Sequence, residues 1–263
     1  MQTLPQIGFK SGELCENALR TEILFHKEGE FFVLNKPAGV DFDTPASREF
    51  GSVITSLREN LQKPEMAFLK MQLPTASSLI SSDVSGACII ACNKEAASLL
   101  KNECGSHLFT FEFLLVCKKS ERAFEPFEVD LPILTPYKKE KAVITHNFGK
   151  KCTTQFAPVK ENGQFQLWSA KTTYLRRHQI RLHASAGGLK ILGDPLYSQT
   201  PFVKLSSLKK GYKKFDEERP LYPFIAIHSA KISFSEKSKF GAIEVLAPLS
   251  KKFNTLLEKL LLV

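Results

Sequence analysis

The order of hydrophobic and polar residues predicts strands in several parts of the chain. Residues 164–170 alternate between the two classes, which is typical of a half-buried strand, and the short apolar run at residues 85–92 is typical of a buried one. Residues 23–40 predict a strand, a turn at Glu28-Gly29-Glu30, a second strand and a loop fixed by Pro37 and Gly39. Further strands are predicted at residues 109–116 and 142–145.

Helices are predicted where apolar residues recur at helical spacing. Residues 52–62 carry such a stripe, and residues 94–103 follow Asn93, a favourable N-cap, with Gly105 placed to end the helix. A last helix begins near Ser250, with apolar residues for docking at Phe253, Leu256, Leu257 and Leu260. Because strands come in runs rather than alternating strictly with helices, we predict an α+β fold with a mainly antiparallel or mixed sheet.

The composition narrows the class of protein. In 263 residues, 36 basic and 27 acidic side chains give a formal charge of +9, which favours an acidic partner such as nucleic acid, although surface solubility alone could also explain it. The six cysteines have no paired CxxC spacing, and several lie in apolar runs, where a buried, reduced thiol is the commonest state. The sequence shows no signal peptide and no membrane-spanning run, so we expect a soluble, cytoplasmic protein with no membrane partner.

A dense cluster of cations lies at residues 176–183, where the chain passes from a predicted strand to a helix beginning near His178. Arg177 and Arg181 are about one helical turn apart, which leaves Ile180 and Leu182 to face a core. Cations gathered at such a junction suit a polyanion or a buried carboxylate. A solvated, charged helix start explains the spacing equally well, so spacing alone leaves both interpretations open.

The His178-Gln179-Ile180-Arg181 motif, followed by Gly193-Asp194-Pro195-Leu196-Tyr197, resembles the signature of RluA-type RNA pseudouridine synthases. Residues 33–40 resemble the family's Lys-Pro-x-Gly turn, and residues 227–234 and 247–249 resemble its closing strands. The matches occur in the family's order and cover about residues 23–250. The resemblance implies a pseudouridine-synthase-like fold, with a large central sheet flanked by helices and an RNA cleft across it.

The same resemblance implies a structured RNA partner, ribosomal or transfer, and isomerisation of uridine without a metal or an organic cofactor. Residues 1–22 are expected to form a leader and residues 23–263 a single domain, because too few residues precede Ile23 for the separate RNA-binding domain of larger members. Single-domain relatives suggest a monomer. The expected RNA-binding residues are Leu79, which could act as an apolar wedge, Arg176, Arg177 and His178.

The sequence departs from the family at the residues nearest the reaction. The family's nucleophile is an aspartate in a His-Arg-Leu-Asp-x-x-Thr-Ser-Gly motif, and ungapped alignment puts Ser81 at its position, Leu79 at the arginine and Asp83 two residues beyond the nucleophile. A carboxylate is ionised at neutral pH, whereas a serine hydroxyl needs a positioned base. Arg181 matches the arginine that pairs with the family's aspartate, so it would have to find Asp83, water or an RNA phosphate. Glu112 replaces a family tyrosine.

Three hypotheses follow from this pattern. The chain could isomerise uridine with Asp83 as the nucleophile beside Arg181, which requires a local rearrangement, because catalytic groups must be placed to about 0.5 Å. It could instead be a pseudoenzyme that binds structured RNA without isomerising it. A serine hydrolase built from Ser81 or Ser85 with His178 has the least support, since the chain has no Gly-x-Ser-x-Gly elbow and no assigned third residue.

Other conspicuous residues favour structural roles. His178 and His183 have no acidic companions at ligand spacing, so no metal site is expected. We expect Lys36 to fix the turn that follows it, Asp194 to serve in a turn, and Trp168 to lie in the core.

Overall fold

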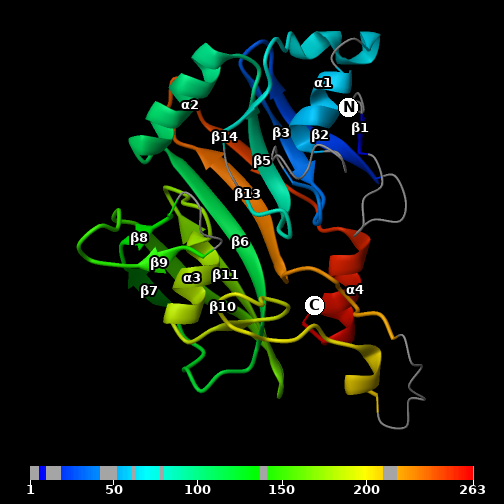
Figure 1. Cartoon of the computed structure of the whole chain (residues 1–263), viewed down its shortest axis with the longest axis vertical. Helices are drawn as coiled ribbons and strands as arrows, with labels where there is room; N and C mark the ends of the chain where they lie inside the picture. The colour runs from blue at the N-terminus through cyan, green and yellow to red at the C-terminus, as the bar shows by residue number, and fades with distance from the viewer. Residues whose placement is uncertain are drawn as a thin grey trace. The chain divides into compact units, whose positions relative to one another are not determined.

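The computed structural model describes residues 6–9, 19–41, 52–60, 63–77, 80–136, 141–209 and 218–262. The chain divides into two compact units (Figure 1). Unit 1 comprises residues 1–112, 173–175 and 229–248, and unit 2 comprises residues 113–172, 176–228 and 249–263. Strands β6 (Phe109–Lys118) and β13 (Ile227–Phe234) each contribute residues to both units. The single domain expected over residues 23–263 stays a prediction.

Unit 1 is built on antiparallel strands. β1 (Gln6–Phe9) pairs with β2 (Leu19–Lys27), β2 with β3 (Phe31–Lys36), and β3 with β5 (Ser85–Ala91). The short strand β4 (Thr75–Ala76) also pairs with β5, and β14 (Ile243–Leu246) pairs with β13. The strand–turn–strand prediction for residues 23–36 and the strand at residues 85–91 are confirmed. β1 lies within residues 1–22, which were expected to form a leader because their apolar residues show no helical or strand periodicity.

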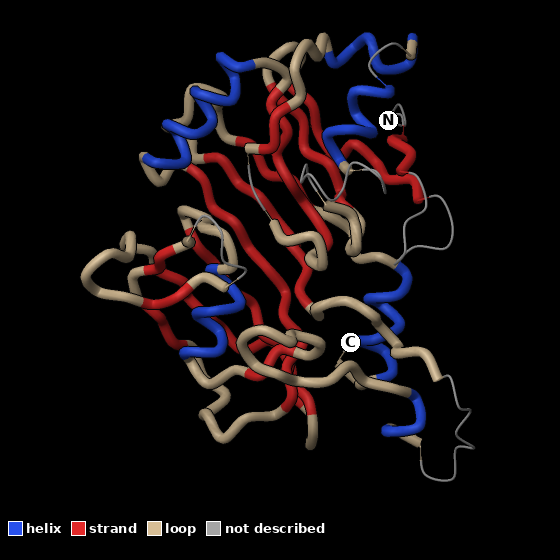
Figure 2. Tube along the Cα trace, in the orientation of Figure 1, coloured by secondary structure: helices blue, strands red, loops and turns tan. Residues whose placement is uncertain are grey.

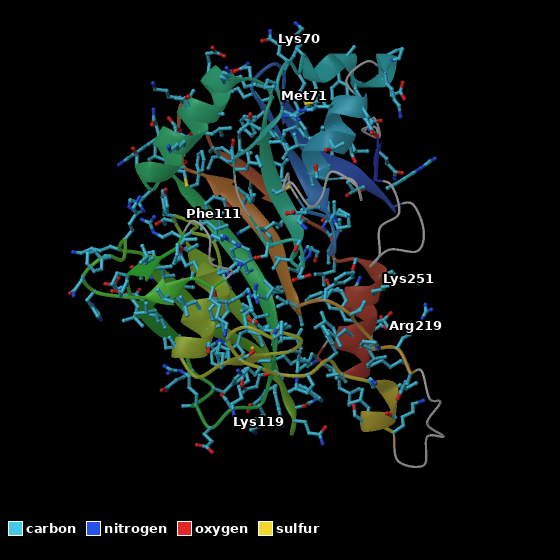
Figure 3. All side chains as sticks on the ribbon, in the orientation of Figure 1. Lys70, Met71, Phe111, Lys119, Arg219 and Lys251 are labelled. Atoms are coloured by element: carbon cyan, nitrogen blue, oxygen red, sulfur yellow. The ribbon has the colours of Figure 1, made fainter. Side chains whose placement is uncertain are left out.

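The core of unit 1 contains several phenylalanine rings. Phe31 is 0% exposed, stacks on Phe234 with 5.2 Å between ring centroids, and meets the edge of Phe240 at 5.0 Å. Phe109 lies 4.3 Å from the ring of Phe234, and Phe111, labelled in Figure 3, is also buried. Aromatic rings of this size supply large buried areas and favour tilted or offset contacts.

Two predicted helices belong to unit 1. α1 (Val53–Asn60) buries Val53, Ile54 and Leu57, as the apolar stripe predicts. α2 (Lys94–Gly105) begins at Asn93, whose side chain accepts a hydrogen bond from the Ala96 amide at 2.8 Å. The predicted N-cap is therefore confirmed. Gly105 lies in the last turn of α2, whereas the left-handed residue that follows is His107, with φ 58°. The 3₁₀ helix η2 (Pro64–Leu69) lies between α1 and β4 along the chain.

Unit 2 contains the antiparallel pairs of β10 (Thr153–Glu161) with β11 (Phe165–Thr172) and with β7 (Phe127–Asp130), and of β12 (Lys190–Ile191) with β6. A separate two-stranded sheet joins β8 (Ile133–Leu134) to β9 (Val143–Ile144). Trp168 on β11 is 0% exposed, with the rings of Phe124 and Phe127 packed edge-on against it. The prediction that Trp168 lies in the core is confirmed.

Two further helices belong to unit 2. α3 (Gln179–Ala186) begins next to His178, and α4 (Lys251–Lys259) begins at Ser250, whose hydroxyl accepts a hydrogen bond from the Phe253 amide. Both helix starts were predicted. The apolar residues predicted to dock the last helix are all buried: Phe253, Leu256, Leu257 and Leu260. The 3₁₀ helix η3 (Leu205–Ser207) lies between β12 and β13 along the chain.

The strand order β1-β2-β3-β5-β13-β6-β11-β10-β7 forms one large sheet, with few helices among the described residues (Figure 2). The predicted α+β class is confirmed, while the RNA cleft stays a prediction. Within the described ranges, no helix is long and apolar enough to cross a membrane. The described cysteines are free thiols, and Cys88, Cys92, Cys117 and Cys152 are buried.

Gly86 on β5 provides a test of this packing. Its φ is +111°, and a Cβ there would lie 2.2 Å from the Ser229 carbonyl oxygen on β13. Gly86→Ala should therefore lower the free energy of unfolding by more than about 2 kcal/mol. The matched control is Gly163→Ala, because a Cβ at Gly163 meets nothing within 4 Å. Urea unfolding of both variants measures the difference, and equal costs would contradict the described approach of β13 to Gly86.

Candidate functional site

The loop that carries Ser81 and Asp83 is held by a buried lysine. Lys36, at the end of β3, is 0% exposed. Its ammonium donates hydrogen bonds to the carbonyls of Pro37 at 2.9 Å, Val40 at 2.8 Å and Ser82 at 2.8 Å. A buried ammonium is tolerated only when it is hydrogen-bonded, and these carbonyls satisfy its three donors. The structural role expected for Lys36 is confirmed.

Backbone contacts complete the attachment of this loop. The Gly39 amide donates to the Ser82 carbonyl at 2.9 Å, and the Val84 amide donates to the Ser81 carbonyl at 3.0 Å. Ser81 and Asp83 are both partly exposed. Their backbone is thus held by main-chain contacts within unit 1. Leu79, the expected apolar wedge, lies outside the described residues.

The start of α3 is fixed by the side chain of Gln179, which is fully buried. Its amide nitrogen donates to the Thr153 carbonyl and to the hydroxyls of Thr154 and Thr172, at 3.2, 3.1 and 3.0 Å. Its oxygen accepts a hydrogen bond from the Arg176 amide at 2.9 Å. Gln179 therefore attaches the arginine cluster to β10 and β11. Gln179 belongs to the His178-Gln179-Ile180-Arg181 motif, but the sequence assigned it no role. Its hydrogen bonds to β10 and β11 appear only in the folded chain.

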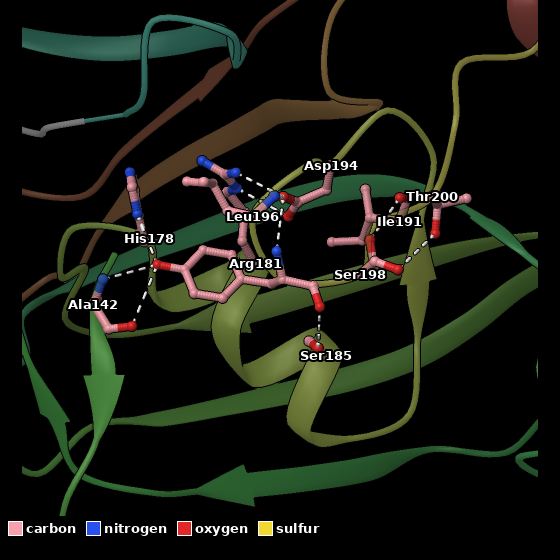
Figure 4. Close-up of polar contacts among 10 residues, drawn as sticks. Ala142, His178, Arg181, Ser185, Ile191, Asp194, Leu196, Ser198 and Thr200 are labelled. Atoms are coloured by element: carbon pink, nitrogen blue, oxygen red, sulfur yellow. Dashed lines mark hydrogen bonds and ion pairs between the residues drawn. The ribbon is translucent and has the colours of Figure 1, made fainter. Parts of the chain in front are cut away.

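Arg181 is buried in an ion pair with Asp194 (Figure 4). The guanidinium Nε lies 3.0 Å from Oδ2 and one terminal nitrogen lies 2.7 Å from Oδ1, with side chains 5% and 0% exposed. This two-point geometry is the strongest form of the arginine–carboxylate pair. Asp194 was not among the partners expected for Arg181; contact of Arg181 with Asp83, water or a phosphate stays a prediction.

Asp194 also shapes its own turn, as predicted. Its Oδ1 atom accepts hydrogen bonds from the amides of Leu196 at 2.9 Å and Tyr197 at 3.3 Å. Short acidic side chains commonly stabilise turns in this way. One carboxylate thus closes the 194–197 turn and attaches it to α3.

Tyr197 links this turn to His178 and to the segment before β9 (Figure 4). Its hydroxyl lies 2.9 Å from His178 Nδ1 and accepts a hydrogen bond from the Ala142 amide, also at 2.9 Å. Burial, together with the charges of Arg181 and Arg177, lowers the pKa of His178 to about 4. The imidazole is therefore neutral at pH 7, and its Nδ1 can accept a hydrogen bond from the tyrosine hydroxyl. Burial raises the pKa of Tyr197, so its hydroxyl keeps that proton.

The remaining cations of the cluster differ in exposure. The guanidinium of Arg176 donates to the Lys151 carbonyl at 3.1 and 3.3 Å, whereas Arg177 is exposed. His183 is fully buried, and its ring nitrogens contact the Thr154 hydroxyl and the Leu131 carbonyl, both at 2.9 Å. Burial lowers the pKa of His183. Within the described ranges, no group of three or more His, Cys, Asp or Glu residues could hold a metal ion.

Glu112, at the position of the family's tyrosine, lies 3.0 Å from the Lys231 ammonium. Hydrogen bonding to Glu112 raises the pKa of Lys231. This acidic side chain is thus held by a cation of unit 1. Ser81, Asp83 and Glu112 belong to unit 1, and residues 176–181 belong to unit 2.

The Arg181–Asp194 pair can be tested by a double-mutant cycle. Asp194→Asn preserves an oxygen for the turn but leaves a buried, uncompensated guanidinium, so it should cost about 3 kcal/mol of unfolding free energy. Arg181→Met alone should also destabilise the protein. The double variant should be more stable than the sum of the single losses predicts, by more than about 1 kcal/mol. Chemical unfolding measures all four proteins, and strictly additive losses would contradict the pair.

The neutral state of His178 predicts a dependence of stability on pH. Its folded pKa, about 4, lies below the ordinary value of 6.5, so its contribution is fully present above pH 6.5 and is lost as the pH falls toward 4. His178→Asn removes the titrating ring and tolerates the left-handed φ of 62°. Its unfolding free energy should therefore fall less steeply than that of the wild type between about pH 7 and pH 5. Identical slopes in urea titrations would show that His178 is not buried as described.

Comparison with known proteins is consistent with this geometry. The RNA pseudouridylate synthase family matches residues 30–186. An uncharacterized RNA pseudouridine synthase of Bacillus subtilis (strain 168) is 21% identical over 238 residues, which cover 90% of this chain and 72% of that protein. Ribosomal large subunit pseudouridine synthase D of Zymomonas mobilis is 22% identical over 179 residues, which cover 68% of this chain and 56% of that protein.

A solved structure from the same family has a similar fold. The solved structure of human RNA pseudouridylate synthase domain containing 4 superposes with a TM-score of 0.66 at 17% identity, covering 90% of this chain and 92% of that one. That likeness supports the fold, and the family match covers more than half of the chain. The chain belongs to the RNA pseudouridylate synthase family, and its motifs group it with the RluA-type members.

Proposed function

We propose that this chain binds structured RNA, ribosomal or transfer, through Arg176, Arg177 and His178 at the start of α3, and that it does not isomerise uridine. The family membership supports an RNA substrate class, and the formal charge of +9 complements a polyanion. The binding role needs no metal and no organic cofactor. We also propose that the protein acts as a monomer in the cytoplasm.

The observation that carries the proposed loss of catalysis is the serine at the nucleophile position. By resemblance, Arg181 pairs with the family's nucleophilic aspartate; here its guanidinium pairs with Asp194, which belongs to the family-like Gly193-Asp194-Pro195-Leu196-Tyr197 motif. The nucleophile position itself holds Ser81, whose hydroxyl is a weak nucleophile without a positioned base. Glu112, at the tyrosine position, is engaged by Lys231. Ser81 thus lacks the carboxylate of the family's nucleophile, and Glu112 lacks the phenol of the family's tyrosine.

The second candidate is an active synthase that uses Asp83. Its support is the loop itself: Lys36 and Gly39 hold the backbone around Ser82, so a carboxylate on this loop starts from a defined position. A defined nucleophile position is what covalent catalysis on the base requires. The serine hydrolase has no such support, because Ser85 is buried on β5 and the His178 ring already meets Tyr197.

The deciding experiment incubates the purified protein with ribosomal and transfer RNA and detects pseudouridine by chemical labelling and primer extension. We expect no pseudouridine from the wild type, and RNA retention that weakens steeply with salt, because phosphate contacts release counterions. Turnover that disappears in Asp83→Asn would overturn the pseudoenzyme proposal in favour of the second candidate. Salt-independent retention would contradict the cationic binding surface.

Ser81→Asp measures how much of the chemistry is missing. Gain of pseudouridine formation is expected only if the carboxylate alone was lost; silence would implicate Glu112 and Leu79 as well. The matched control is Ser82→Asp, which adds the same charge to the same loop one residue further along. Equal activity in both variants would argue against a position-specific nucleophile.

A further inference from the structure

The segment of residues 142–151, which includes β9, carries the most exposed large hydrophobic side chain in the described part of the chain. Phe148 is 75% exposed, and Val143 on the same segment is 42% exposed. Single exposed apolar residues are common on protein surfaces, so exposure alone decides nothing. The backbone around Phe148 and the charges beside it give its exposure a specific meaning.

The turn that presents Phe148 is held on both sides. The Thr145 amide donates to the Pro132 carbonyl at 3.1 Å, and the Gly149 amide donates to the Thr145 carbonyl at 2.9 Å. A Cβ at Gly149 would lie 2.3 Å from the Thr145 oxygen and 2.8 Å from the Pro132 carbonyl. The backbone is therefore closely packed at Gly149, and a larger residue there would disturb the turn that carries Phe148.

The segment of residues 142–151 is also attached to the arginine cluster at both ends. At its start, the Ala142 amide binds the Tyr197 hydroxyl, which in turn meets His178. At its end, the Lys151 carbonyl accepts hydrogen bonds from the Arg176 guanidinium. Beneath it, Leu182 of α3 packs against the buried cluster of Ile133, Ala142 and Cys152. The exposed ring is thus mounted on the same framework as the proposed RNA-binding cations.

Two cations follow Phe148 in the sequence, separated from it by Gly149. Lys150 and Lys151 are both exposed, and neither ammonium takes part in an ion pair within the described ranges. Exposed lysines without acidic partners are suited to phosphate groups. An aromatic ring next to such lysines is the combination that single-stranded nucleic acids recognise, since bases stack on rings while cations follow the backbone.

We propose that an unpaired base of the bound RNA stacks on Phe148 while flanking phosphates contact Lys150 and Lys151. The inference rests on the proposed RNA binding and adds a second contact surface outside the start of α3. An unpaired base is required because bases inside an A-form duplex do not offer their faces to a side chain.

The test compares two synthetic RNAs, a stem–loop with an unpaired loop and a continuous duplex of the same length. Phe148→Ala should weaken stem–loop binding about tenfold and leave duplex binding within about twofold, whereas Phe148→Trp should retain the wild-type affinity. The matched control is Leu246→Ala, which removes a side chain that is 64% exposed on β14. Equal losses in Phe148→Ala and Leu246→Ala would overturn the proposal.

Salt dependence separates the base contact from the phosphate contacts. The double variant Lys150→Gln/Lys151→Gln should reduce the slope of log affinity against log salt by about 0.7 for each lysine, while Phe148→Ala should leave the slope unchanged. In Phe148→Trp, the introduced indole should be quenched by the stem–loop, whereas native Trp168 is 0% exposed and shielded from RNA. An unquenched emission at saturating RNA would exclude stacking.

The outcomes distinguish this inference from the proposed function. If the wild type binds neither RNA, both the proposed function and the stacking contact fail. If the wild type binds the stem–loop and Phe148→Ala binds it equally well, the proposed base contact of Phe148 alone fails and the proposed RNA binding stands.

Discussion

The pair of Arg181 and Asp194 is the interaction on which the arrangement of unit 2 depends. Both side chains are almost completely buried, and burial makes their separation costly, because each would leave an unpaired charge in the interior. The pair holds α3 against the 194–197 turn. That turn orients Tyr197, and Tyr197 in turn holds His178 and Ala142. The cationic start of α3 and the segment of residues 142–151 are therefore both connected to the Asp194 carboxylate.

Unit 1 uses a second buried cation for a related purpose. Lys36 satisfies its donors with backbone carbonyls and so holds the loop around Ser82. Under the pseudoenzyme proposal, this scaffold persists with Ser81 at the position that the resemblance assigns to the nucleophile. The attachment of the loop acts on main-chain atoms, whereas the chemistry requires a particular side chain. Fold and catalysis can consequently be lost separately.

The two proposals describe a protein that retains RNA recognition without a carboxylate at the nucleophile position. Arg181 is buried in its pair with Asp194, and Glu112 pairs with Lys231. Exposed cations are found instead at Arg177, Lys150 and Lys151, beside a solvent-facing aromatic ring at Phe148. Phosphate contacts and base stacking need only surface groups of this kind, and they do not require an activated nucleophile.

The sequence by itself determined the strand at residues 85–91, the N-caps at Asn93 and Ser250, the buried position of Trp168 and the family, because periodicity, capping and motifs are encoded within a few neighbouring residues. Tertiary structure alone decided the partner of Arg181, the strand β1 and the exposure of Phe148. Each of these depends on segments that are distant in the chain: Asp194 reaches α3 only through a loop, and the turn that carries Phe148 is attached to Pro132 through the Thr145 amide. Local pattern cannot specify such contacts, since many pairings satisfy the same charges and periods until packing selects one.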